Sequence, residues 1–170
     1  RDLFAGVPDA RARGYAPVPV TLPSGDRAVL AVGGELKSTC CVASGRHAWV
    51  SQHVGEQGTL ATLEAFEATV EQFTAMYAVT PDVVAVDAHP GYATSQWARR
   101  RFPAGATPIV EVQHHHAHVA AVMAEHGLDP HEPVLGFAFD GTGYGTDGSI
   151  WGGEALVATA LALRTSERDV

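Results

Sequence analysis

The spacing of apolar residues changes once along this chain of 170 residues, and that change restricts the fold more than any other feature. Between residues 28 and 53 the apolar residues form three short runs separated by tight turns, the pattern of an antiparallel meander. Over residues 59–79 they recur every three or four positions, which predicts an amphipathic helix that Pro81 ends. Strands that alternate with helices follow, so we expect an α/β fold.

The rest of the chain keeps this alternation of strands and helices. Three antiparallel strands followed by helix-strand-helix-strand-helix match one lobe of the ribonuclease-H-like fold. Two such lobes in tandem form the actin, Hsp70 and sugar-kinase type of nucleotide-binding protein. A new hairpin between Val134 and Leu156 would then begin a second lobe. The elements expected after the first helix are strands over 82–89, 108–113 and 133–140, and helices over 93–102 and 114–127.

The expected domain boundaries follow from these patterns. Residues 1–27 contain Gly, Pro and Arg with no clear period, which is typical of a connector or the tail of a preceding domain. Residues 28–130 would form the first lobe. Residues 131–170 would hold the first hairpin of a second lobe and then trail off, so we expect that lobe to be truncated.

Composition narrows the class of partner. The formal net charge of −8 argues against a nucleic-acid backbone as the main partner. No apolar run reaches the roughly 18 residues that a membrane-spanning helix needs, and the N-terminus lacks the profile of a signal peptide. Cys40 and Cys41 are adjacent, which makes a mutual disulfide geometrically awkward, and the chain has no other cysteine. We therefore expect a reducing, cytoplasmic setting with no membrane or nucleic-acid partner.

A run of four histidines within five residues is the strongest chemical signal. On a helix, His114 and His118 are one turn apart, so both rings point the same way, as two ligands of one metal ion do. The alternative is a polar helix start with solvated rings. Imidazole with carboxylate suits iron or zinc, and Asp140, at the end of an apolar strand, is the expected third ligand unless it caps its own turn. His115 and His116 would point elsewhere and support the ligands or contact substrate.

The glycine-rich segment 140–148 is a candidate phosphate-binding turn. Its glycines allow positive φ and let backbone N–H groups approach a ligand, and its threonines add hydroxyls. A flexible hairpin is the alternative, and Asp147 would repel a phosphate unless a cation lay between them. The residues expected to contact phosphate here are Gly141, Thr142, Gly143, Gly145 and Thr146.

A second candidate is the turn between the first two predicted strands, where two-lobed ATPases place their first phosphate loop. Its spacing is not that of a Walker A loop, because the Gly-x4-Gly-Lys pattern and a following helix are missing. A plain hairpin is the alternative. The residues expected to contact phosphate or a metal-bound water are Gly33, Gly34, Lys37, Ser38 and Thr39.

Together these segments resemble the HypF family of hydrogenase maturation carbamoyltransferases. The matching stretches follow the same order over nearly all of residues 11–156, and VQHHHAH and FDGTGYGTDGSIWGGE are the most specific. The resemblance implies a two-lobed domain similar to the tRNA threonylcarbamoyl transferases, with residues 11–23 as the exit from a preceding YrdC-like domain. It also implies His114 and His118 as the metal-binding pair, Asp140 as a third ligand, and two hairpins that face a nucleotide.

The resemblance further implies a reaction. The family makes carbamoyl-adenylate from carbamoyl phosphate and ATP in the YrdC-like domain. The last domain then passes the carbamoyl group to the C-terminal cysteine of its partner HypE, which leads to the cyanide ligands of NiFe hydrogenase. The divalent metal would act as a template and charge stabiliser, and the partner's thiolate would be the nucleophile. No residue of this chain is therefore assigned as catalytic.

Two alternatives stay open. One is an O-carbamoyltransferase acting on a small molecule, although such enzymes usually place the YrdC-like module after the transferase module. The other is a non-catalytic lobe that binds a nucleotide or the maturation partner, which the early end of the chain favours. A tRNA threonylcarbamoyl transferase usually lacks the HHHAH run, and a sugar kinase or Hsp70-type ATPase has no use for paired histidines.

Overall fold

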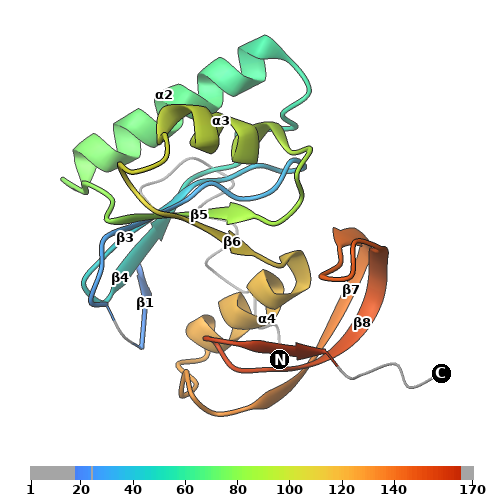
Figure 1. Ribbon diagram of the computed structural model, residues 1–170. Coiled ribbons are helices and arrows are strands. Elements are labelled where there is room, and N and C mark those ends of the chain that lie inside the picture. Colours follow the sequence, from blue (N-terminus) through green and yellow to red (C-terminus); the bar gives the residue numbers. More distant parts are fainter. Residues whose placement is uncertain (1–17, 24, 166–170) are drawn as a thin grey trace.

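Two β-sheets with a helix between them make up the fold (Figure 1). The computed structural model describes residues 18–23 and 25–165. Its elements are β1 (Val20–Thr21), β2 (Val29–Ala31), β3 (Cys41–Ser44), β4 (His47–Val50), α2 (Leu60–Met76), β5 (Val83–Asp87), α3 (Ala93–Arg101), β6 (Ile109–Val112), α4 (His114–Glu125), β7 (Val134–Tyr144), β8 (Ile150–Ala158) and β9 (Leu163–Thr165). Helices α2 and α3 cover one side of the larger sheet, and α4 lies between the two sheets.

The larger sheet is mixed, with strand order β1-β4-β3-β2-β5-β6. Strands β2, β3 and β4 form the antiparallel meander that the sequence predicts, with Gly45 at φ +56 in its tight turn. β2 also pairs in parallel with β5, and β5 in parallel with β6, so Leu30 lies opposite Val84. Helices carry the chain between the parallel strands, because parallel neighbours need a crossover. The expected α/β class is confirmed.

Two segments contain strands that the sequence analysis missed. Val20 and Thr21, in the stretch predicted to be a connector, form β1 and pair with Ala48 and His47 at the edge of the meander. Residues 163–165, where the chain was expected to trail off, form β9 along β8. Both strands are very short, so neither shows the alternation that identifies a strand in sequence. The remainder of the predicted connector, residues 1–17 and 24, lies outside the described part.

The glycine-rich turn is shorter than predicted. β7 continues to Tyr144, with a register shift between Phe139 and Gly143, so residues 140–144 of the glycine-rich segment are strand. The turn itself is held by Asp147, whose Oδ1 accepts hydrogen bonds from the Ser149 N–H and hydroxyl and from Trp151 Nε1, at 2.9, 2.7 and 3.1 Å. Asp147 therefore stabilises the turn from within, and these bonds hold the pKa of its carboxyl below the ordinary value.

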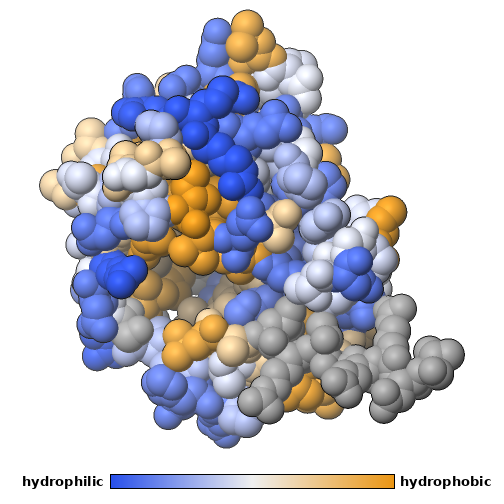
Figure 2. All heavy atoms as spheres, in the orientation of Figure 1, coloured by the Kyte–Doolittle hydropathy of each residue, from blue (hydrophilic) through white to orange (hydrophobic). Residues whose placement is uncertain are grey.

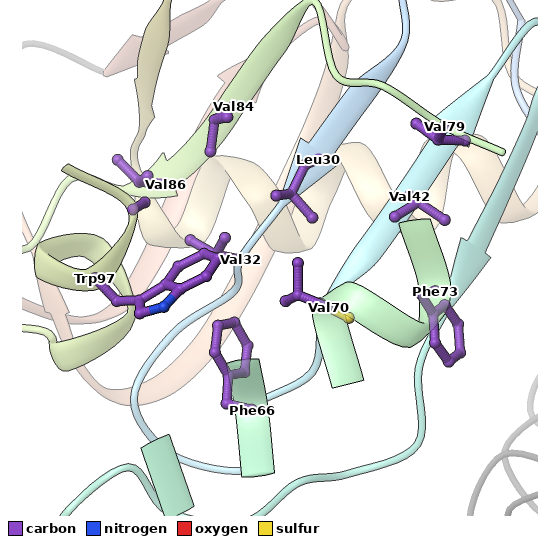
Figure 3. Close-up of a cluster of buried hydrophobic side chains, with 12 residues drawn as sticks. Leu30, Val32, Val42, Phe66, Val70, Phe73, Val79, Val84, Val86 and Trp97 are labelled. Atoms are coloured by element: carbon purple, nitrogen blue, oxygen red, sulfur yellow. The ribbon is translucent and has the colours of Figure 1, made fainter. Parts of the chain in front are cut away.

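Helix α2 supplies the core of the larger sheet. It begins with a capping box in which Thr59 and Thr62 each accept a hydrogen bond from the other's backbone N–H. Phe66, fully buried, meets the Trp97 ring of α3 edge-on, with centroids 5.5 Å apart (Figure 3). The side chains that α2 buries against the sheet are Phe66, Val70 and Phe73.

Helix α4 forms a second core with the smaller sheet. Val119 and Met123 of α4 pack with side chains of β8, among them Trp151 and Leu156. Gly127, at φ +61, follows the end of the helix in the left-handed conformation that its position predicts. Because α4 follows β6 after a single residue, this packing sets the smaller sheet close to the ends of the parallel strands.

Figure 2 shows a group of apolar side chains in the middle of one face, with a hollow in the surface beside it. Among the described residues, no helix has both the length and the apolar character that a membrane span requires. Cys40 and Cys41 are not joined by a disulfide, and burial raises the pKa of the Cys40 thiol. A buried, protonated thiol of this kind is a packing residue.

Replacing Phe66 by Ala tests this core. The change removes a fully buried ring beneath the sheet, so we expect the free energy of unfolding to fall by about 3–5 kcal/mol in urea denaturation. Leu60→Ala, in the first turn of the same helix, is the matched control, because Leu60 is 72% exposed. The control should change stability by less than about 0.5 kcal/mol. Equal losses in the two variants would contradict this arrangement.

Candidate metal centre

Three side chains from two elements meet at the N-terminal end of α4. His114 and His118 lie one turn apart, so their rings share a face of the helix. Asp140 reaches them from β7, which packs along α4. Its Oδ2 lies 2.8 Å from His114 Nε2 and 3.6 Å from His118 Nε2, and the two Nε2 atoms are 3.2 Å apart. The three ligand atoms all lie within 4.8 Å of one another, so one ion could contact them all.

Asp87 holds His114 from the other side of its ring. It is the last residue of β5 and is buried. Its Oδ2 lies 2.7 Å from His114 Nδ1, which donates the hydrogen bond. This bond raises the pKa of His114, against the effect of burial and with a further contribution from Asp140. The sequence analysis gave Asp87 no site role, although its place at the end of an apolar strand, like that of Asp140, was an available signal.

Asp140 serves both its own turn and the cluster. Its Oδ1 accepts a hydrogen bond from the Gly141 N–H at 2.7 Å, while Oδ2 faces the two imidazoles. Burial opposes its ionisation, but the bond from Gly141 and the proximity of His114 outweigh burial, so the pKa of Asp140 lies below its ordinary value. The two roles considered for this residue, turn cap and ligand, use different oxygens and are compatible.

The two middle histidines point away from the ligand pair, as expected, and pack against protein; the His115 ring also meets the His114 ring edge-on, with centroids 5.8 Å apart. His115 is fully buried, stacks on Trp151 with centroids 6.1 Å apart, and has its Nδ1 3.1 Å from the side-chain nitrogen of Gln113. Burial lowers the pKa of His115. His116 Nε2 lies 2.9 Å from the Thr159 carbonyl oxygen. Both side chains thus attach α4 to the smaller sheet.

A cavity of about 740 Å³ opens beside the cluster. The loop between β2 and β3 forms one wall and β7 forms another, and His114 and His118 also line it. Its size suits a small-molecule ligand. The residues predicted to contact phosphate that do line this cavity are Gly34, Lys37, Thr39, Gly141 and Thr142.

Three predicted phosphate contacts from the β7–β8 hairpin do not line this cavity. A Cβ on Gly143 would overlap the His115 ring, and a Cβ on Gly145 would overlap the Trp151 ring, so both glycines allow close packing. Thr146 is exposed in the turn. The sequence predicts a close approach of these glycines to a ligand, but in the structure they approach the rings of His115 in α4 and Trp151 in β8.

The predicted phosphate contacts in the loop between β2 and β3 are also split between residues that line this cavity and residues that do not. Gly33 lines a neighbouring cavity of about 380 Å³. Ser38 is buried and pairs with Gly55, which removes it from the first cavity. Glu35, which the sequence analysis passed over, fixes the loop to α3, because its carboxylate accepts a hydrogen bond of 2.7 Å from the Ala93 N–H.

The fold and the cluster correspond to a known class of domain. Residues 24–125 match the HypF Kae1-like domain, and residues 136–167 match the second subdomain of the carbamoyltransferase Kae1-like domain. The chain is thus a Kae1-like domain of mixed α/β structure. It belongs to the HypF family, as the resemblance in its sequence indicated.

Relatives of known identity agree with this assignment. Carbamoyltransferase HypF of Synechocystis sp. is 47% identical over 150 residues, which cover 88% of this chain and 19% of the relative. Carbamoyltransferase HypF2 of Cupriavidus necator is 46% identical over 154 residues, which cover 91% and 19%. A crystal structure of full-length HypF in the phosphate- and nucleotide-bound form has a TM-score of 0.81 at 42% identity, covering 89% of this chain and 23% of that one. This chain spans about one fifth of the length of these curated relatives.

A pair of glycine variants tests how β7 packs on α4. Gly143→Ala would place a methyl group in the space of the buried His115 ring, so we expect a loss of about 1–3 kcal/mol in the free energy of unfolding. Gly141→Ala is the matched control two residues away, because a Cβ there meets no atom within 4 Å. Urea denaturation followed by Trp fluorescence measures both. An unchanged Gly143→Ala protein would show that β7 lies elsewhere.

Proposed function

We propose that this protein is a carbamoyltransferase of NiFe-hydrogenase maturation that acts in the cytoplasm. It would move a carbamoyl group from carbamoyl-adenylate to the C-terminal cysteine of a HypE-type acceptor protein. One observation carries this proposal: His114, His118 and Asp140 converge at a cavity whose walls also carry the phosphate candidates. Support comes from relatives named as carbamoyltransferases and from a HypF structure described as bound to phosphate and nucleotide.

The cluster has the donor set of a divalent metal site. Imidazole nitrogen and carboxylate oxygen are common ligands of iron and zinc in proteins. His114 directs its Nδ1 at Asp87, so its Nε2 faces the cluster, as a metal-binding histidine requires. When bound, the ion would supply positive charge that offsets the charge of a nucleotide phosphate. We propose iron or zinc, with His114, His118 and Asp140 as ligands.

Five residues on the cavity walls form the proposed nucleotide site. Lys37 would pair its ammonium group with a phosphate, and the Thr39 and Thr142 hydroxyls would donate hydrogen bonds. Gly34 and Gly141 keep the walls free of side chains, which lets a phosphate approach the backbone. The carbamoyl-adenylate would bind with its phosphate at these groups and its carbonyl beside the cluster.

The larger sheet would be the first lobe of a ribonuclease-H-like, actin-type fold. By the order of its elements, residues 28–130 form this lobe and residues 131–170 begin the second, with the cavity between them. Residues 1–27 would connect to a preceding YrdC-like domain. In the whole protein, that domain would make carbamoyl-adenylate from ATP and carbamoyl phosphate.

In the proposed reaction the acceptor cysteine, as a thiolate, attacks the carbonyl carbon of carbamoyl-adenylate. A carbon–sulfur bond forms, the bond from the carbonyl carbon to the phosphate oxygen breaks, and AMP leaves with the electron pair. The cysteine proton has gone to solvent beforehand. The residues of this chain bind and orient the adenylate, and none of them needs to form a covalent bond.

Metal content tests the cluster. After anaerobic purification we expect about one iron or zinc ion per chain, because the ligands are already assembled. His114→Ala, His118→Ala and Asp140→Ala should each lose most of it. His126→Ala, at the C-terminal cap of the same helix, is the matched control and should keep the metal. Elemental analysis of the folded proteins measures the metal content per chain. Metal retained in all three variants would contradict the assignment of these ligands.

Transfer itself is tested by mixing the chain with a peptide that ends in cysteine, ATP, carbamoyl phosphate and a separately supplied YrdC-like domain. We expect mass spectrometry to show one carbamoyl group on the terminal cysteine. Lys37→Ala should lower the initial rate by about 10-fold or more, because it removes a charge at the phosphate site. Arg100→Ala, an exposed cation of α3, is the control and should not change the rate. An unmodified peptide with folded, metal-loaded wild type would contradict catalysis by this chain.

A further inference from the structure

We infer that Asp87 is a positioning residue that holds the His114 ring in the orientation and tautomer needed for metal binding. This inference rests on the proposed metal site and adds a residue that is not itself a ligand. It predicts that the affinity of the cluster for metal depends on a carboxylate belonging to the larger sheet.

The His114 ring lies between two carboxylates on opposite sides. Its Nδ1 is 2.7 Å from Asp87 Oδ2, and its Nε2 is 2.8 Å from Asp140 Oδ2. The two ring nitrogens point in different directions, so an ion bound at Nε2 beside His118 cannot also reach a group that is bonded to Nδ1. Asp140 is therefore placed to be a ligand and Asp87 to be an acceptor for the Nδ1 proton.

Asp87 is itself held firmly by its neighbours. Its Oδ1 accepts a hydrogen bond from the His89 N–H at 2.8 Å, and its backbone carbonyl accepts one from the buried Ser95 hydroxyl at 3.1 Å. The side chain is 6% exposed. Asp87 is thus restrained by the loop that follows its own strand and by α3, and a carboxylate held in this way can fix the ring that donates to it.

The two histidines of the cluster differ in this respect. The His114 side chain is 22% exposed and is held at both nitrogens, whereas the His118 side chain is 59% exposed and meets the cluster through Nε2. His114 is thus the ligand whose orientation is fixed in advance, and His118 completes the site from a more exposed position. An acceptor on the outer nitrogen also increases the basicity of a ligating imidazole.

Metal affinity measured on the whole chain tests this role. Asp87→Asn keeps the shape of the side chain but removes its charge, and we expect zinc affinity, by competition with a chelator, to fall by about 10- to 100-fold. Asp87→Glu restores the carboxylate and should recover part of that loss. Asp82→Asn is the matched control. Asp82 lies just before the same strand, and its carboxylate accepts a hydrogen bond from the Ala28 N–H. A role in packing alone would reverse the order of the Asn and Glu variants.

The ring itself provides a readout that needs no metal. In nitrogen-15 spectra of the metal-free chain, at a pH where the ring is neutral, we expect His114 to carry its proton on Nδ1, with the signal assigned by its loss in His114→Gln. A proton on Nε2 in the wild type would overturn the inference, even if Asp87→Asn fails to fold. So would a zinc affinity of Asp87→Asn within about twofold of the wild type. If the wild type binds no zinc, the proposed metal site is wrong. The nitrogen-15 spectrum then still shows whether Asp87 holds the His114 proton on Nδ1.

Discussion

One imidazole ring joins the two halves of this structure. His114 lies between Asp87 of the larger sheet and Asp140 of the smaller sheet, at 2.7 and 2.8 Å. The site depends on this arrangement, because α4 leaves β6 after one residue and then packs on β7 and β8. The end of β5 in the larger sheet and strand β7 of the smaller sheet are thereby brought to the N-terminal end of α4. A shift of α4 would therefore separate the His114 ring from both carboxylates, those of Asp87 and Asp140.

The same arrangement explains the charge pattern of the site. The pKa of Asp140 is lowered, and the hydrogen bond to Asp87 raises the pKa of His114, so each of these two groups is favoured in its charged form. Across the cavity, Lys37 is the one lysine of the chain. A cation bound at the cluster and the ammonium group of Lys37 would act on an anion in the cavity from two sides.

The local parts of this account were predictable from sequence, and the long-range parts were not. The pairing of His114 with His118 follows from helical spacing alone, and the meander of β2, β3 and β4 follows from short apolar runs. Asp87 could not be identified as a partner of His114, because that contact depends on how β5 and β6 align in parallel. Gly143 has the flexibility of a phosphate loop, but the buried His115 ring fills the space beside it.

The most direct test of the central claim is the X-ray absorption spectrum of the zinc-loaded chain. If the ion binds where α4 meets β7, the spectrum shows imidazole scattering from about two histidines and nitrogen or oxygen neighbours at about 2.0–2.1 Å. A shell of sulfur at about 2.3 Å would instead place the ion at a cysteine. That result, or a spectrum without imidazole scattering, would contradict a metal centre built from His114, His118 and Asp140.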